Sequence, residues 1–301
     1  MRNFTFKGLF LAIVYIVLGS LSIQAADGLI TKQITIKLEK AGTLPNKIGS
    51  TKKFQITNLK IIGEINGTDL QMIREMAGKD ARGNDTDGML SVLDLSDAKI
   101  VEGKGYYMGN SYSTSNDKIG DLAFEGCSGL TSLTLPSGLT EIGSCTFRGC
   151  SGLTSLTLPS GVTKIGYYAF EGCSGLTSLT LPSGVTEIGY SAFEGCSGLT
   201  SIYVYTEKLP DMGRDVFDGC DAKKCTVYVP KGTYDDYWLS EFGYFENIVE
   251  FDPTGINNVI TSNDAKELSR YSLNGQRLSS PAKGLNIVKY SDGSVKKVAI
   301  Q

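Results

Sequence analysis

The sequence contains no histidine and only one tryptophan among its 301 residues. Without an imidazole, the chain cannot form a Ser-His-Asp or Cys-His nucleophile system, a histidine metal site or a histidine pH switch. The formal net charge is −3, and no basic stripe is present. Release of counterions therefore cannot supply binding energy for DNA or RNA, so no nucleic-acid partner is expected.

Long apolar runs are absent after the N-terminus. Arg2 and Lys7 precede an almost wholly apolar stretch, residues 8–18, and a shorter mixed segment that ends in Ala25-Ala26. This order of a basic start, an apolar stretch and small residues predicts a signal peptide over residues 1–26. No later run reaches the roughly 18 apolar residues that a membrane helix needs, so no transmembrane anchor is expected after cleavage.

A period of 23 residues organises the middle of the chain. The motif Gly-Cys-Ser-Gly-Leu recurs with an interval of 23 between successive cysteines, and a fifth cysteine follows after 24: Cys127, Cys150, Cys173, Cys196 and Cys220. The first three motifs lead into the spacing Leu-x-x-Leu-x-Leu, as in Leu130-x-x-Leu133-x-Leu135, which is typical of a leucine-rich-repeat strand. The period predicts a solenoid, in which each coil buries its apolar side chains against the next.

Other residues that recur at this period are predicted to form the core. They are an isoleucine column (Ile119, Ile142, Ile165, Ile188), a phenylalanine column (Phe124, Phe147, Phe170, Phe193, Phe217) and an aliphatic column (Leu139, Val162, Val185). One coil alone cannot offset the entropy of ordering its 23 residues, at about 1–2 kcal/mol each. The terminal coils should therefore be capped.

The repeat unit LTSLTLPSGVTEIGYSAFEGCSG closely resembles the BspA-like leucine-rich repeats of secreted and surface proteins of anaerobic Gram-negative bacteria. Residues 41–76 look like the family's N-terminal segment, and residues 227–249 are similar to its last coil and closing helix. The resemblance implies a β-rich leucine-rich-repeat solenoid with 23-residue coils and short helical turns. It also implies adhesion to host matrix or to other cells.

The region of residues 27–117 is expected to be an N-terminal cap with irregular leucine-rich coils. Residues 33–38 alternate as a strand, and the leucine-rich spacing recurs in residues 56–61 and 90–95. Thr68-x-x-Gln71 predicts a helix start with a capping box, and Gly78 its end. Residues 102–117 form a polar loop that contains tyrosines. The regular solenoid with its C-terminal cap is expected over residues 118–251.

The composition changes after Phe251. Residues 252–265 are predicted to be a linker and residues 266–301 a small β module, with turns at Asn274-Gly275 and Asp292-Gly293. Residues 271–277 and 284–288 resemble C-terminal sorting modules of the type IX secretion pathway. The resemblance implies outer-membrane translocation, although the segment is shorter than a full module.

No cofactor and no metal site are expected. The five repeat cysteines should point inward as reduced thiols that pack as small hydrophobes, and an odd total of seven prevents complete internal pairing. Cys145 with Cys150 and Cys220 with Cys225 are the pairs close enough in sequence to form disulfides. Residues 84–88 resemble part of a calcium loop but lack its first acid and its final Glu, which favours a simple turn.

The expected functional surface is the outer face of the leucine-rich strands. Polar and aromatic residues alternate there with the buried leucines, and the candidates for partner binding are Thr134, Thr157, Thr180, Tyr203, Tyr205 and Tyr228. Threonine ladders also suit β-strands for structural reasons alone. Amphipathic aromatic residues, in contrast, are enriched where proteins bind proteins.

These features favour an exported, non-enzymatic protein that mediates protein–protein interaction or adhesion at the cell surface. The expected partner is a protein or a macromolecule of the host matrix or cell surface, and the chain is expected to be a monomer. One alternative is a secreted glycan hydrolase that uses paired carboxylates, such as Asp94 with Asp97 or Asp235 with Asp236. Another is a structural spacer of the cell envelope.

Overall fold

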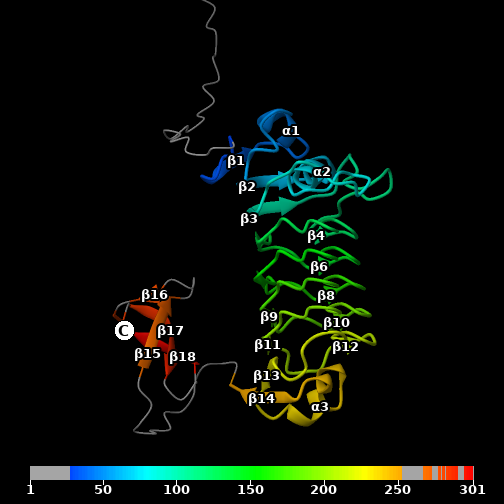
Figure 1. The fold of residues 1–301 in the computed structure, drawn as a ribbon. Helices are drawn as coiled ribbons and strands as arrows, with labels where there is room; N and C mark the ends of the chain where they lie inside the picture. The colour runs from blue at the N-terminus through cyan, green and yellow to red at the C-terminus, as the bar shows by residue number, and fades with distance from the viewer. Residues whose placement is uncertain are drawn as a thin grey trace, which may run out of the picture.

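The computed structural model describes residues 28–252, 267–272, 277–278, 280–281, 283–290 and 295–300. The predicted signal peptide, all but the first residue of the predicted linker, and the two predicted turns of the C-terminal module lie outside these residues. Within them, stacked coils run from the N-terminal helices at one end to the segment of residues 234–251 at the other (Figure 1).

The N-terminal part is built on three parallel strands that run side by side. They are β1 (Ile34–Leu38), β2 (Asn58–Ile65) and β3 (Val92–Ile100), with the helices α1 (Leu44–Ile48) and α2 (Gly67–Met76) between them in the chain. The leucine-rich positions predicted here, which include Leu59, Ile61, Leu93 and Leu95, are fully buried. The irregular repeats therefore continue the same sheet as the regular ones.

Helix α2 begins two residues earlier than the predicted capping box implied. Asn66, not Thr68, caps it: the Asn66 side chain accepts a hydrogen bond from the Thr68 amide at 3.0 Å, and the Asp69 carboxylate accepts one from the Asn66 amide at 3.0 Å. Asn and Asp fill these two positions as well as Thr and Gln would. Asp69 also accepts the Leu44 amide, which fastens α1 to α2.

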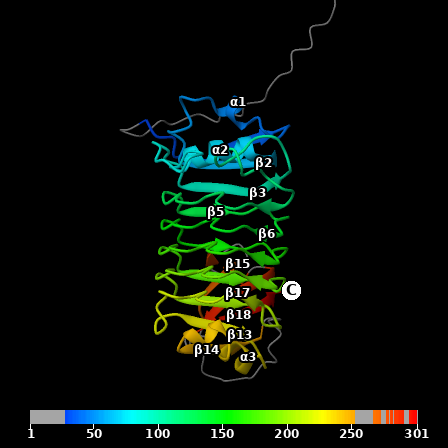
Figure 2. The same ribbon diagram turned by 90° about the vertical axis from the view of Figure 1, so that its right-hand side faces the viewer.

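The leucine-rich strands of the regular coils continue this parallel sheet. They are β5 (Ser132–Thr134), β7 (Leu156–Thr157), β9 (Ser178–Leu181), β11 (Ser201–Val204) and β13 (Thr226–Pro230), and β14 (Asn247–Phe251), which lies outside the repeat, pairs with β13 at the end of the sheet. β5 pairs with β3, and the Ser132–Ser155 bridge joins β5 to the sheet of the later coils. The strands lie one above another along the solenoid axis (Figure 2).

A second parallel sheet, which the sequence did not predict, contains the isoleucine column. Its strands are β4 (Lys118–Ile119), β6 (Glu141–Ile142), β8 (Lys164–Ile165), β10 (Glu187–Ile188) and β12 (Asp211–Met212). The isoleucines themselves are buried, as predicted. Strands of two residues are too short to show the alternating pattern by which strands are recognised in sequence.

The core confirms the predicted columns. The five phenylalanines form one continuous stack, with ring centroids 5.6, 5.2, 5.1 and 5.8 Å apart and interplanar angles of 18° or less. Each ring is at most 1% exposed. Glycines permit this spacing, since a Cβ atom on Gly166 would lie 2.6 Å from the backbone of the coil before it. A side chain there would push neighbouring coils apart.

The last coil is followed by α3 (Tyr234–Trp238), the 3₁₀ helix η1 (Glu241–Tyr244) and β14. Phe242 and Phe245 contact the final ring of the stack, Phe217, at centroid distances of 5.0 and 5.1 Å. Buried Tyr237 donates a hydrogen bond to the Thr206 carbonyl. These contacts cover the end of the core. That the solenoid needs this segment as a cap stays a prediction.

The C-terminal residues form an antiparallel sheet of four strands. They are β15 (Glu267–Ser272), β16 (Arg277–Leu278), β17 (Gly284–Tyr290) and β18 (Val295–Ile300), in the order β16-β15-β17-β18. The pairs β15–β16 and β17–β18 correspond to the two predicted hairpins. A role of this sheet in type IX sorting stays a prediction.

The polar loop of residues 102–117 is fastened to the solenoid. Tyr107 is buried, and its hydroxyl donates a hydrogen bond of 2.9 Å to the Asp121 carbonyl. Thr114, also buried, donates to the Val101 carbonyl at 2.7 Å.

No helix among the described residues is long and apolar enough to cross a membrane.

Candidate functional site

Five of the six predicted binding residues lie in one row across the strand sheet. Thr157 is in register with Thr180, Thr180 with Tyr203, and Tyr203 with Tyr228. Thr134 occupies the equivalent position of β5. Tyr205 comes two residues after Tyr203 and therefore lies in a neighbouring row on the same side. We call this surface, residues 134, 157, 180, 203, 205 and 228, the strand face.

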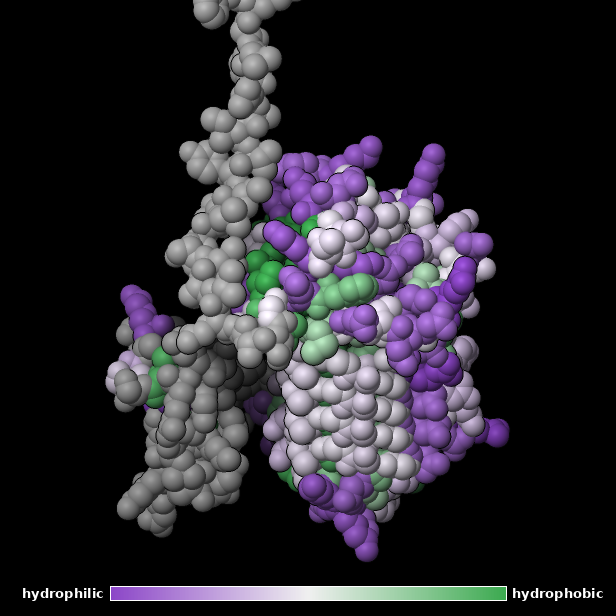
Figure 3. Space-filling model, turned by 45° about the horizontal axis from the view of Figure 1, so that its top comes forward, coloured by the Kyte–Doolittle hydropathy of each residue, from purple (hydrophilic) through white to green (hydrophobic). Residues whose placement is uncertain are grey.

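The alternation of the repeat explains why these side chains point outward. In each strand the residue before the row, such as Leu133, Leu156 or Leu179, is buried. Because successive side chains of a strand point to opposite sides, the next residue must leave the core. Thr134 and Thr157 are exposed, whereas Thr180 and the tyrosines are half-buried. The coils appear in the space-filling view as regular rows of intermediate hydropathy (Figure 3).

The C-terminal end of the strand face is an aromatic cluster. The rings of Tyr203 and Tyr228 stack in parallel, with centroids 4.6 Å apart and planes inclined by 6°. Phe251 packs edge-on against Tyr205 at 5.3 Å and against Tyr203 at 6.4 Å. Phe251 is not among the predicted binding residues, because β14 does not carry the repeat that singled out the others.

Burial raises the pKa of both Tyr203 and Tyr205, and the neighbouring Tyr228 raises that of Tyr203 further. Both phenols therefore stay protonated at neutral pH and keep the capacity to donate a hydrogen bond. The cluster offers ring edges and neutral hydroxyls rather than charge, a surface typical of protein recognition.

A charged group lies at the other end of the same row. Lys60, in register with Asp94, places its Nζ atom 2.9 Å from Asp94 Oδ2, 2.8 Å from Asp97 Oδ2 and 3.1 Å from Ser96 Oγ. Desolvation acts to raise the pKa of Asp94, but hydrogen bonds from Ser96 and Lys60 outweigh it and hold this pKa below its usual value. A general acid needs a raised pKa, so Asp94 is unsuited to that part of a hydrolase mechanism.

The other pair of carboxylates considered for a hydrolase lies elsewhere. Asp235 and Asp236 are adjacent, exposed residues of the first turn of α3. They are not in the strand face, and the pocket described below does not include them. The structure therefore does not bring them together with the residues predicted to bind a partner.

All seven cysteines are free thiols. From Cys150 to Cys220 the repeat cysteines form a ladder in which each thiol donates to the phenylalanine carbonyl of the preceding coil, as Cys150 Sγ does to Phe124 O and Cys173 Sγ to Phe147 O, both at 3.1 Å. Burial raises the pKa of Cys173 to about 12. Cys145 is only partly buried. The inward-pointing reduced thiols predicted for the repeats are confirmed.

The segment compared with a calcium loop is a hydrogen-bonded turn. The Asp80 carboxylate accepts hydrogen bonds from the amides of Arg82 and Asn84, at 2.7 and 2.9 Å, and Asp85 pairs with Lys79 at 2.6 Å. Within the described ranges, no three histidine, cysteine or acidic side chains gather closely enough to hold a metal ion.

Charges on the second sheet alternate between coils. Lys164 and Glu187 lie in register with a Nζ–Oε1 distance of 2.7 Å, and Lys118 pairs with Glu141 at 2.5 Å. Exposed pairs of this kind contribute little stability each. They do favour one register between neighbouring coils, because a slipped coil would separate the opposite charges.

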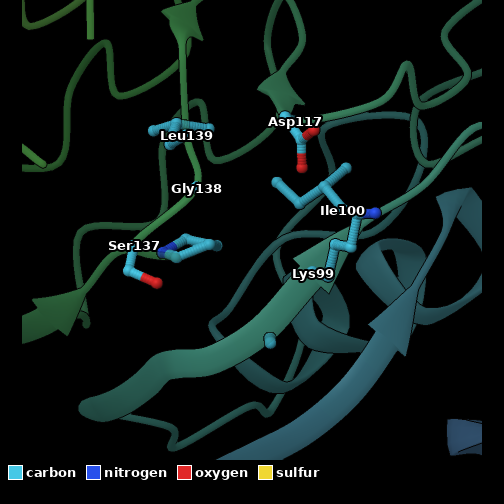
Figure 4. A pocket seen from close by; sticks show the side chains of 8 residues that line it. Lys99, Ile100, Asp117, Ser137, Gly138 and Leu139 are labelled. Atoms are coloured by element: carbon cyan, nitrogen blue, oxygen red, sulfur yellow. The ribbon is translucent and has the colours of Figure 1, made fainter. Parts of the chain in front are cut away.

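A small pocket lies where β3 passes the first regular coil. Lys99, Ile100 and Asp117 line one side, and the turn of residues 136–139 lines the other (Figure 4). Its volume is about 220 Å³, below the roughly 300–1,000 Å³ of most small-molecule sites. Asp117 is the one carboxylate in its lining, so the pocket does not supply the carboxylate pair of a glycosidase.

Comparison with known proteins identifies the repeat. A family model described as the BspA type leucine-rich repeat region matches residues 112–234 in six copies. No curated protein matches the chain. Among solved structures, a leucine-rich repeat protein of T. pallidum is 28% identical over 46% of this chain and 56% of its own, with a TM-score of 0.30.

Two further solved structures are similar to parts of the chain. The pneumococcal vaccine antigen PcpA is 17% identical over 66% of this chain and 52% of its own, with a TM-score of 0.35. A leucine-rich cell surface protein of Faecalibacterium prausnitzii is 20% identical over 65% of this chain and 51% of its own, with a TM-score of 0.25. The chain spans about half the length of the solved proteins it matches. Residues 112–234 match the model of BspA-type leucine-rich repeats, and the stacked parallel strands of the structure fit a leucine-rich-repeat solenoid.

Proposed function

We propose that this is an exported, non-enzymatic protein that binds another protein, of the host matrix or of a cell surface, through the strand face. The observation that carries the proposal is the single row formed by Thr134, Thr157, Thr180, Tyr203 and Tyr228. Hydroxyl groups and aromatic edges stand in it at a spacing of about 4.8 Å set by the coils. The rigid core behind the row limits the entropy lost on binding.

Adhesion at the cell surface is the biological role we propose for this binding. The basic and apolar pattern of residues 1–26 supports export, and BspA-type repeats are the family feature that supports adhesion. The missing histidine and the lowered pKa of Asp94 support a non-enzymatic role. Mass spectrometry of the secreted chain tests export directly, because cleavage near Ala25 or Ala26 should remove about 26 residues.

The binding surface is tested by adding bulk to it. We expect Thr157→Arg with Thr180→Arg to weaken binding of an extracellular-matrix protein captured by the chain at least tenfold, because each new side chain stands in the middle of the row. Ser160→Arg with Ser183→Arg is the matched control. These residues are exposed, lie in the same two coils with the same 23-residue separation, and belong to the turns outside the strands.

Surface plasmon resonance would measure the affinities, and circular dichroism would confirm that both double variants keep the melting temperature. Adding arginine at the two threonines is preferable to replacing Tyr203 or Tyr228 by alanine. Truncating either tyrosine would also remove a stacked ring contact of about 0.5–1.5 kcal/mol and so change the stability of the fold. Equal affinity of the two double variants would show that the partner binds away from the strand face.

A further inference from the structure

Exposed apolar side chains are concentrated at the C-terminal end of the solenoid. Among the described residues, ten large hydrophobic side chains are exposed, and half of them lie within residues 234–249. Leu239 is 83% exposed and Trp238 46%. Soluble proteins rarely leave such side chains clustered in water unless the cluster has a partner.

Three of these side chains lie on or next to α3. Tyr234 and Trp238, four residues apart, share one side of the helix, with ring planes inclined by 7° and centroids 6.1 Å apart. Leu239 follows directly. Tyr237 alone among the aromatic residues of the helix is turned into the core, where it contacts Phe242. We call Tyr234, Asp235, Asp236, Trp238 and Leu239 the α3 patch.

The α3 patch is held in place by the neighbouring strand. The Glu250 carboxylate of β14 accepts hydrogen bonds from the amides of Gly232 and Tyr234, at 2.8 and 3.1 Å. The hydroxyl of Tyr237 donates to the Thr206 carbonyl at 2.8 Å. The exposed rings are therefore presented by a fixed helix, and a partner would not have to order it.

The charge around the α3 patch is strongly negative. Residues 205–252 contain eleven Asp and Glu against five Lys and Arg, a net charge of −6 in a chain whose total is −3. Asp235 and Asp236 are exposed, and no ion pair joins either carboxylate to a cation in the part of the chain that the structure describes. The partner that complements this surface is cationic.

We propose that the α3 patch is a docking surface for an arginine-rich segment of a partner protein. A guanidinium group can stack on Trp238 or Tyr234 while it hydrogen-bonds to Asp235 or Asp236, and its aliphatic stem can cover Leu239. Lysine offers the charge without the planar stacking group. This site is separate from the strand face, so it does not depend on the function proposed above.

Trp238 is the only tryptophan of the chain and therefore reports directly on the α3 patch. Titrating the full mature chain with a decamer of arginine should change its fluorescence saturably, and a decamer of lysine should bind at least threefold more weakly. Asp235→Asn with Asp236→Asn should weaken arginine binding at least fivefold. Asp85→Asn with Asp87→Asn, which removes the same charge from an exposed turn of the N-terminal part, should change it less than twofold.

Several results would overturn the proposal. An unchanged Trp238 emission would show that the peptide does not bind at the α3 patch. Equal weakening by the two double variants would show that the peptide binds only through overall charge. Equal affinity for the arginine and lysine peptides would contradict the proposed stacking of a guanidinium group on Trp238 or Tyr234. Residues 266–301 carry seven Lys and Arg against two acids, so a shift of Trp238 emission by added salt without any peptide would show that this chain's own segment occupies the patch.

Discussion

Replacing Phe170 by alanine tests how the coils stabilise one another. Phe170 is fully buried and stacks on Phe147 at 5.2 Å and on Phe193 at 5.1 Å, so the substitution removes two ring contacts and leaves a cavity in the middle of the stack. Phe-to-Ala changes in protein cores cost about 3–5 kcal/mol. Since two aromatic contacts of about 0.5–1.5 kcal/mol each are lost, we expect the upper half of that range.

Urea unfolding followed by circular dichroism would measure the loss, with thermal unfolding as a second readout. For a domain of this size the melting temperature should fall by roughly 8–20 °C. Tyr167→Ala is the matched control, because Tyr167 belongs to the same coil and is 55% exposed; its effect should stay within about 0.5 kcal/mol. A cost below about 1 kcal/mol for Phe170→Ala would refute stabilisation by the stack.

The thiols give two further predictions. Ellman's reagent at pH 8 should label Cys145 before any other cysteine of the folded chain, because Cys145 is only partly buried; rapid labelling of Cys173 instead would contradict its burial. Burial raises the pKa of Cys173 and Cys225 to about 12, whereas a thiol of the unfolded chain titrates near 8.5. Between these values only the folded state holds the proton, so the free energy of unfolding in urea should change little between about pH 6 and pH 8 and fall as the pH rises from about 9 towards 12. Cys173→Ser should reduce this fall by about 1.4 kcal/mol for each pH unit, and an unchanged slope would show that Cys173 does not contribute.

The core could be predicted from the sequence because each of its positions repeats. A residue that recurs every 23 positions must occupy the same place in each coil, so Phe124 to Phe217 were identified as one stack without any coordinates. The alternation along each leucine-rich strand likewise placed Thr157 and Tyr203 on one outer face. Both inferences depend on periodicity, which is the strongest signal that a single sequence provides.

Features without periodicity were harder to predict. The start of α2 was misplaced because Thr68-x-x-Gln71 and Asn66-x-x-Asp69 are both acceptable capping boxes, and only packing against α1 selects the second. The loop of residues 102–117 was recognised as polar, yet its composition gave no sign that Tyr107 is buried.

The contacts of Phe251 at the aromatic end of the strand face and the α3 patch also lack periodicity, so neither could be predicted from the sequence. Phe251 joins the tyrosine cluster from a strand outside the repeat, and the exposed rings of α3 occur once in the chain. Their exposure is a property of the folded end of the solenoid. Repeats therefore predicted the row of the strand face, whereas the contacts at its end required the structure.

Hydrogen exchange of the chain in complex with its captured partner tests most directly whether the strand face is the binding surface. The account predicts that binding slows exchange of the amides of β7, β9, β11 and β13 and leaves those of the second sheet, β6, β8 and β10, unchanged. Slower exchange confined to the second sheet, with the strands that carry Thr157 and Tyr203 unaffected, would contradict it.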